Sequence, residues 1–359
     1  MKHRSNDKLK KSSQWFAAAL CTLLAGFTVL TCTRSTVPAE DYAQKLEAAE
    51  RTAACFSYVK ELKQERGIPI DPAADPNETG LIGDEYTLIT TTLGDLPAKR
   101  TSTNPNFAAL VVELFHQLGL APGDKIAVNC SGSFPALNIA VLCAIDTLSL
   151  DPVIISSFGA STHGANQPGL TYPDMEYALY QAGLVRHKSD YLSIGGNLDI
   201  GTDMDPRLTA EIRARLEADG YPFLYDENLY RNIENRYAYY NEGTPVKCLV
   251  NVGGNDASFG DSMVMVHAAG GILTELSEKD HSTGLVQLAL ADGIPVVHLL
   301  NLKGLAADYG LPFDPVPLPT VGEGAVYYHV TYRKPLAAAV LLAAVLMLLR
   351  AAYWLRRKE

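Results

Sequence analysis

The feature that most constrains this chain of 359 residues is a pair of apolar segments, one near each end. The first runs from Trp15 to Thr31 without a charge, and the second is apolar from Leu336 to Leu349. Both approach the length of about 20 residues that a helix needs to cross a bilayer. We therefore predict a transmembrane anchor over residues 15–33 and a transmembrane helix over residues 335–355.

Basic residues flank both segments on the side nearer the chain end. Because such flanks stay in the cytoplasm, they predict a basic cytoplasmic tail over residues 1–14 and a second tail over residues 356–359. The expected partner is a lipid bilayer, and the expected location is the cytoplasmic (inner) membrane, crossed twice, with both termini cytoplasmic. Residues 67–332 then form an extracytoplasmic domain, although Arg333 and Lys334 on its side oppose this orientation.

The N-terminal segment has two other interpretations. A cleaved signal peptide has the same basic and then apolar form. The string "VLTC", which ends at Cys32, resembles a lipoprotein cleavage site, although Thr31 stands where a smaller residue is usual. We favour an uncleaved anchor because no small-x-small cleavage site follows the apolar run.

Charge narrows the set of partners for the middle of the chain. Each end (residues 1–34 and 333–359) holds six basic residues and one acidic residue of the totals of 30 and 40. The middle therefore keeps 18 basic and 38 acidic residues, a net charge of −20. Such a segment repels nucleic acid, which we exclude as a partner, and an anionic ligand needs a local basic site.

A juxtamembrane helix is predicted over residues 35–66. The string Ser35-Thr36-Val37-Pro38 has the hydroxyl and the early proline of a helix start. From about Ala39 to Arg66, apolar residues recur at three- and four-residue steps. This pattern suits either a stalk or a helix that packs on the domain, and both alternatives stay open.

Short apolar strands alternate with helices in the domain, most clearly in "KIAVNC", "FPALNIAVLCAIDTL" and "PVIISS". This alternation is typical of a parallel sheet covered on both faces. We predict an α/β fold with a mostly parallel, Rossmann-like layered sheet outside the membrane, flanked by the two transmembrane helices. The other predicted elements are the strands "EYTLITT", "DYLSIGG", "VKCLVNVGG" and "GIPVVHLLN", and helices over "NPNFAALVVELFHQLGL" and residues 206–218.

The string "TTTLGDLPAKRTSTNP" is predicted to connect a strand to a helix that opens at Pro105. In open α/β sheets the loops after the strands form the ligand crevice, and a helix start favours an anion. The string therefore predicts a site for carboxylate or phosphate with these candidate residues: Lys99, Arg100, Thr101, Ser102 and Thr103. The alternative is that Thr103 or Asn104 only caps the helix while the cations offset Asp95.

Two further turns supply candidates for the same anion site. Ser131, Gly132 and Ser133 follow the strand "KIAVNC", and Gly254 and Asn255 follow the strand "VKCLVNVGG". Ser131 or Ser133 stands where a nucleophile elbow places its serine, but the G-x-S-x-G pattern is absent. Ser133 as a simple helix cap is the alternative.

Motifs for metals and nucleotide cofactors are missing. Asp199, Asp203 and Asp205 lack the Gly and Glu that complete a calcium loop, and the histidines form no ligand pair, so we predict no metal. His163 and His281 are candidate acid/base groups. The absence of P-loop and dinucleotide motifs leaves any cofactor unknown, and the cysteines are expected to be small buried side chains, with one disulfide left open.

The strings "GLIGDEYTLITTTLGDLPAKRTSTNPNFAALVVELF" and "GDKIAVNCSGSFPALNIAVL" lie between the two membrane segments. Together they resemble the bacterial poly-gamma-glutamate system protein family, most closely from Gly80 to Leu142. The resemblance implies an accessory membrane protein that helps to make, export or retain poly-γ-glutamate. It also implies the membrane subunits of the poly-γ-glutamate synthase as partners, and it supplies no catalytic residues.

Three functions remain open at this stage. The first is an accessory component whose outer domain binds carboxylate groups of the polymer or of a precursor. The second is an extracytoplasmic hydrolase or transferase that uses Ser131 or Ser133, with a histidine such as His163 as base, on an acyl or amide substrate. The third is a non-catalytic assembly scaffold, so the sequence leaves open whether the protein is an enzyme.

Overall fold

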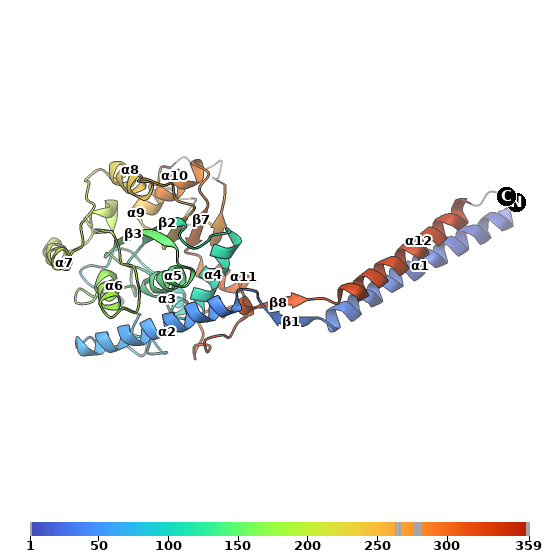
Figure 1. Cartoon of the computed structure of the whole chain (residues 1–359), viewed down its shortest axis with the longest axis horizontal. Coiled ribbons are helices and arrows are strands. Elements are labelled where there is room, and N and C mark those ends of the chain that lie inside the picture. Colours follow the sequence, from blue (N-terminus) through green and yellow to red (C-terminus); the bar gives the residue numbers. More distant parts are fainter. Residues whose placement is uncertain (1, 263, 265–266, 276–281, 357–359) are drawn as a thin grey trace. The chain divides into compact units, whose positions relative to one another are not determined.

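The computed structural model describes residues 2–262, 264, 267–275 and 282–356. The chain divides into two compact units. Met1–Ala39 and Tyr328–Glu359 make up the first, here called the terminal unit, and Glu40–Tyr327 makes up the second, the α/β unit (Figure 1). Each is described by itself.

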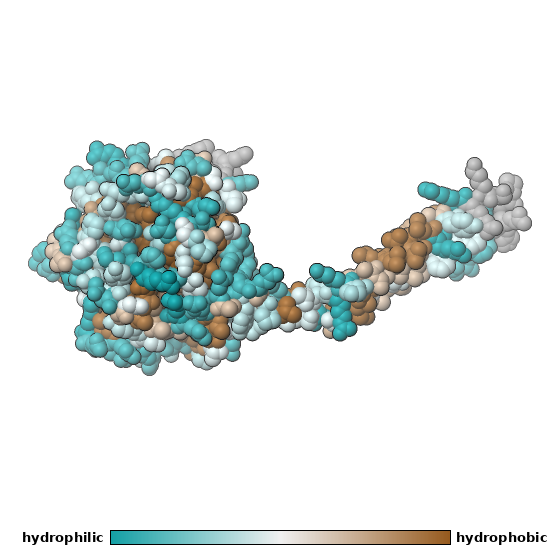
Figure 2. All heavy atoms as spheres, viewed as in Figure 1, coloured by the Kyte–Doolittle hydropathy of each residue, from teal (hydrophilic) through white to brown (hydrophobic). Residues whose placement is uncertain are grey.

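The terminal unit consists of two long helices and two short strands. Helices α1 (Lys2–Cys32) and α12 (Lys334–Arg356) are long and apolar enough to cross a membrane, and Figure 2 shows their apolar surface in brown. They pack closely, since a Cβ atom on Gly26 would lie 2.3 Å from Val340 Cγ1. Nearer the N-terminus of α1 and the C-terminus of α12, Lys11 Nζ lies 4.9 Å from the centre of the Trp354 ring.

The predicted helix start at Ser35 is wrong. Strand β1 (Ser35–Pro38) occupies these residues and pairs antiparallel with β8 (Tyr328–Thr331). The β-branched pair Thr36 and Val37 favours an extended chain, and β8 provides the partner that the sequence alone does not reveal. The next helix, α2, begins only at Tyr42 and ends at Glu65.

Helix α2 belongs to the α/β unit. Its buried face, with Ala48, Ala49 and Phe56, joins the core cluster that also contains helices α4 (Phe107–Gln117) and α5 (Pro135–Leu148). The structure therefore shows the packed helix and not the stalk, and the compact unit begins at Glu40 rather than at residue 67.

A mostly parallel sheet of six strands forms the centre of the α/β unit, as predicted. The strand order is β4-β3-β2-β5-β7-β6, and within the described residues only β6 runs antiparallel to its neighbour. The chain order of the strands reverses between β2 and β5. The strands are β2 (Lys125–Cys130), β3 (Asp151–Ser157), β4 (Tyr191–Ser193), β5 (Leu249–Val252), β6 (Gly271–Leu273) and β7 (Val296–Leu299).

Helices cover both faces of the sheet (Figure 1). In β2, Ile126 and Val128 join the core cluster of α2, α4 and α5, while Ala127 joins the cluster of α8 and α10 on the other face. This alternation puts Asn129 on the α8 face as well. The remaining helices are α3 (Leu96–Ser102), α6 (Tyr172–Gln181), η1 (Asn197–Asp199), α7 (Pro206–Ala218), α8 (Leu229–Tyr240), α9 (Asp256–Phe259), α10 (Leu285–Ala291), α11 (Leu302–Asp308) and η3 (Ala325–Tyr327).

The segment before α4 differs from the prediction. "EYTLITT" forms no strand and keeps only an isolated bridge from Thr90 to Ala160, because it lies against the loop after β3 and not along a strand. After it, Asp95 caps a short helix, α3, that contains Lys99 and Arg100. Helix α4 then begins at Phe107 and not at Pro105.

Candidate functional site

A crevice lies where the chain order of the strands reverses, at the carboxyl ends of β2 and β5. This is the position where open α/β sheets bind ligands. It consists of two cavities of about 290 Å³ and 140 Å³, which share the lining residues Thr92, Ser133 and Gly254. We call the larger cavity the Lys99 pocket and the smaller one the Asp256 pocket, after one lining residue of each.

Lys99 reaches the Lys99 pocket from helix α3 and is 2% exposed. Its Nζ atom donates to Ser161 Oγ at 2.8 Å and to the backbone oxygen of Ser133, and it lies 3.8 Å from the centre of the Phe134 ring. No carboxylate forms a salt bridge with it among the residues that the structure describes. Burial lowers the pKa of Lys99 to about 7, so both its charged and its neutral form are populated near neutral pH.

Four of the candidate residues beside Lys99 are engaged elsewhere. Arg100 forms a bidentate ion pair with Asp314, with distances of 2.6 and 2.5 Å, and this hydrogen bond raises the pKa of Arg100. The hydroxyls of the other three donate to backbone oxygens three or four residues back: Thr101 to Pro97, Ser102 to Lys99, and Thr103 to Arg100. These residues therefore do not form the anion site that was predicted at a helix start. They lie in the last turn of α3, where the exposed carbonyl groups repel an anion.

The turn after β2 brings its two serines into the crevice. Ser131 Oγ accepts from the backbone N–H of Ser133 at 3.2 Å, and Ser133 Oγ accepts from the backbone N–H of Ser161 at 3.0 Å. Ser133 is not the helix cap, since Phe134 holds that position. A Cβ atom on Gly132 would lie within 2.9 Å of the backbone oxygens of Phe158 and Gly159, so glycine lets this turn pack on the end of β3.

The Asp256 pocket is lined by hydroxyl, amide and carboxylate groups. Asp256 accepts from the backbone N–H of Leu198 at 2.7 Å, and its pKa is raised by burial and by the nearby charges of Asp199 and Asp203. Ser157 Oγ and Asn255 Nδ2 are buried without a hydrogen-bond partner in the described residues. The pocket therefore offers polar groups that the protein itself does not satisfy.

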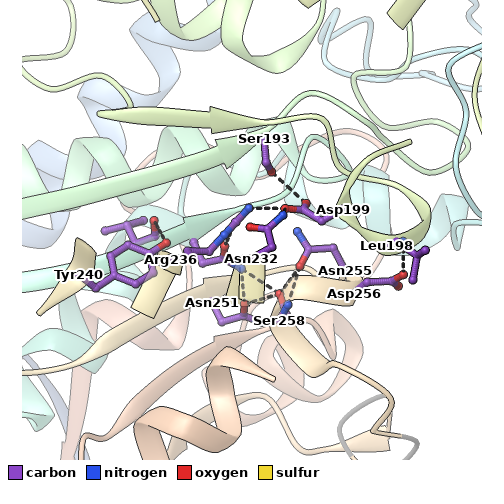
Figure 3. A network of polar contacts seen from close by, with 12 residues as sticks. Ser193, Leu198, Asp199, Asn232, Arg236, Tyr240, Asn251, Asn255, Asp256 and Ser258 are labelled. Atoms are coloured by element: carbon purple, nitrogen blue, oxygen red, sulfur yellow. Dashed lines mark hydrogen bonds and ion pairs between the residues drawn. The ribbon is translucent and has the colours of Figure 1, made fainter. Parts of the chain in front are cut away.

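A buried polar network supports the floor of the crevice (Figure 3). Arg236 on α8 donates to Asp199 at 2.6 Å and to Asn129 at 2.7 Å, and Arg236 and Asp199 are both fully buried as an ion pair. Asn129 in turn donates to Asn251 in β5, at 2.9 Å. Ser258 then joins Asn251 to Asn255, at 2.8 and 2.6 Å, which fixes Asn255 at the rim of the Asp256 pocket.

The three aspartates of the 199–205 region have separate structural partners. Asp199 pairs with Arg236, Asp203 accepts from the backbone N–H of Asn197, and Asp205 caps helix α7. The described residues contain no group of three or more side chains suited to hold a metal. Of the two candidate histidines, His163 does not line either cavity, and His281 lies outside the described residues.

Ser161 and Lys303 are among the lining residues of the Lys99 pocket that sequence reasoning missed. Ser161 lies in the loop after β3, and Lys303 lies in α11, after β7. Both follow carboxyl ends of parallel strands, so the rule that located Ser131 and Gly254 applies to them as well. A larger cavity of about 630 Å³, between α8 and residues 223–225, shares no lining residue with the crevice.

Comparisons of the chain with protein-family models, curated proteins and solved structures found no match. Five of the residues that were predicted from the sequence line the two cavities: Lys99, Ser131, Ser133, Gly254 and Asn255. Gly132 shapes the turn, and the others lie in the last turn of α3.

Proposed function

We propose that this chain is a membrane-anchored accessory component of a poly-γ-glutamate synthesis or export system. In this proposal α1 and α12 cross the inner membrane with both termini in the cytoplasm. The α/β unit, a Rossmann-like domain, lies outside and binds carboxylate groups of the polymer or of a precursor, and the partners are membrane subunits of the synthase. The resemblance over Gly80–Leu142 and the two apolar helices support this placement.

The observation that carries the binding proposal is Lys99 on the wall of an open cavity, where no carboxylate of the described residues forms a salt bridge with it. An ammonium group has three N–H donors. Two of them are directed to Ser133 and Ser161, so the third is available to a ligand. Lys303 lines the same cavity and adds a second positive charge. The two lysines outweigh Asp95, the one carboxylate among the described lining residues, which suits an anionic ligand in a unit that is otherwise acidic.

Deletion of this gene alone tests the placement in the polymer system, with secreted and cell-bound poly-γ-glutamate quantified separately. We expect loss or redistribution of the polymer, restored by the wild-type gene. The variant Lys99→Met should fail to restore it. The matched control Lys247→Met changes a lysine that is 61% exposed and pairs with Asp124, and it should restore the polymer fully. Unchanged polymer in both fractions after deletion would refute the proposal.

A further inference from the structure

We infer that Ser161 and Lys99 form an acyl-transfer dyad in the Lys99 pocket. Ser161 Oγ is the nucleophile and Lys99 Nζ is its general base, and the substrate is the amide bond of a γ-glutamyl compound. The choice of a γ-glutamyl substrate rests on the proposed function. The dyad itself rests only on the geometry of the pocket.

The two reacting groups are already in hydrogen-bond contact. Lys99 Nζ and Ser161 Oγ are 2.8 Å apart, and both residues line the same cavity. Among the described residues, the Ser161 hydroxyl has no other hydrogen-bond partner. A nucleophile and a base at this distance, beside an open cavity, meet the geometric requirement for a serine–lysine pair.

Gly94 lets the turn before α3 pack directly against the pair. A Cβ atom at this position would lie 2.9 Å from both Ser161 Oγ and Lys99 Cε. The backbone angle of Gly94 is not in the left-handed region, so the turn itself does not require glycine there. The close packing of this turn against Lys99, Ser161 and the Thr162 backbone oxygen therefore requires glycine, and it helps to hold the two reacting atoms in place.

The environment of Lys99 favours the neutral amine that a base needs. Burial desolvates the charged form of Lys99 and outweighs the opposing effect of Asp95, and no carboxylate forms a salt bridge with Lys99 in the described residues. The Ser133 carbonyl accepts one N–H of the amine and holds it in place. The lone pair is then free to accept the proton of the Ser161 hydroxyl.

The reaction balances without a cofactor. Ser161 Oγ bonds to the amide carbon while its proton moves to Lys99 Nζ, and Lys99 then gives this proton to the leaving nitrogen as the C–N bond breaks. Water, or an acceptor amine, attacks the resulting ester and passes a proton to Lys99. Lys99 returns that proton to Ser161 Oγ as the ester bond breaks, which restores both residues.

The lining of the pocket indicates the class of substrate. Lys303 is exposed and lines the cavity, so it can keep a carboxylate bound, more weakly, after Lys99 has lost its proton and acts as the base. Leu93, Phe134 and Phe313 supply apolar surface for a methylene chain. A γ-glutamyl group carries both a carboxylate and two methylene groups beside its scissile amide, and it matches this lining.

Labelling of the full-length protein in detergent with a fluorophosphonate probe tests the dyad. We expect one adduct, mapped by mass spectrometry to Ser161, and none in Ser161→Ala. Lys99→Met should slow the labelling by about 10²-fold, the low end for loss of a general base. In the wild type the labelling rate should rise as the pH passes through 7, because the neutral amine becomes the main form.

Two controls separate catalysis from misfolding. Ser57→Ala removes an exposed hydroxyl on α2, and Lys247→Met removes an exposed lysine, so both should label like the wild type. The thermal unfolding of every variant is compared with the wild type. An adduct on Ser131 or Ser133, a rate that does not change with pH, or no adduct in the folded wild type would overturn the dyad.

Release of p-nitroaniline from γ-glutamyl-p-nitroanilide tests the substrate class. The wild type should release it, and Ser161→Ala should not. Labelling of Ser161 without release would overturn the γ-glutamyl assignment. The Ser161→Ala variant should still bind γ-glutamyl oligomers, so a failure of the dyad and a failure of the proposed binding function give different results.

Discussion

Lys99 and Arg236 are both buried cations near the same end of the sheet, yet their surroundings differ. Arg236 is fully enclosed and donates to the carboxylate of Asp199 and to Asn129. Lys99 is also buried, but it contacts only neutral acceptors and lines an open cavity. One cation forms an ion pair within the fold. The other forms no salt bridge in the described residues, although the charge of Asp95 on the same cavity wall acts on it.

The difference separates a structural charge from a functional one. A buried ion pair with additional hydrogen bonds holds its neighbours in place, and the loss of one partner leaves the other charge unpaired. A buried lysine without a carboxylate has a lowered pKa and can bind an anion or accept a proton. We therefore assign the support of the crevice to Arg236 and its chemistry to Lys99.

The largest expected effect comes from breaking the structural pair. Arg236→Met should lower the free energy of unfolding by about 3–5 kcal/mol, because Asp199 is left buried and charged. Arg231→Met is the matched control on the same helix, since Arg231 is 69% exposed and its pair with Asp226 lies at the surface. Chemical denaturation of the full chain in detergent measures both, and equal losses would contradict the comparison.

A methyl group at Gly94 should disturb Lys99 without touching Arg236. Gly94→Ala should lower the free energy of unfolding by about 1–3 kcal/mol, because the new Cβ meets Lys99 Cε, Ser161 Oγ and the Thr162 backbone oxygen within 2.9 Å. Gly169→Ala is the control, since its Cβ would meet only Ile68, at 3.6 Å. Binding of γ-glutamyl oligomers should be lost in the first variant and kept in the second.

The pH dependence of stability distinguishes an unpaired lysine from a paired one. The unfolded chain protonates Lys99 at its ordinary pKa of 10.5, while in the folded protein the pKa is about 7. Between these values the unfolded state binds more protons, so the wild type gains stability as the pH rises through this window. Denaturation of Lys99→Met should lack this gain, and parallel curves for the two proteins would show that Lys99 is not desolvated.

The smallest effect is expected at Arg100. Its pair with Asp314 is partly exposed, so Arg100→Ala should lower the free energy of unfolding by only about 0.2–1 kcal/mol. Because Arg100 does not line the crevice, the affinity for γ-glutamyl oligomers should match that of the wild type. A large loss of affinity for these oligomers in a folded Arg100→Ala variant would show that Arg100 belongs to the binding site.

Periodic and buried elements of this fold could be predicted from the sequence. The strand "KIAVNC" has the predicted limits, and helices α5 and α7 were predicted within a residue of theirs, because their apolar patterns and prolines mark both the type and the ends. The string "EYTLITT" has an equally good strand pattern but bridges only at Thr90, to a residue of a loop. A strand depends on a partner that its own residues do not specify.

The site was predictable in its position but not in its chemistry. The rule for the carboxyl ends of strands located Ser133 and Gly254. It could not separate Lys99 from Arg100, which are adjacent in sequence but point to a cavity and to Asp314 respectively. The contact of Lys99 with Ser161 joins residues 62 positions apart, so only the folded chain reveals it.

The most direct test of the role of Lys99 is calorimetric titration of the full-length protein with a γ-glutamyl oligomer at pH 6 and pH 8. With a pKa of about 7, the charged fraction of Lys99 falls about tenfold between these values. We predict a comparable loss of affinity in the wild type and weak, pH-independent binding in Lys99→Met. Equal affinities of the two proteins at both pH values would contradict the assignment of Lys99 as the ligand-binding cation.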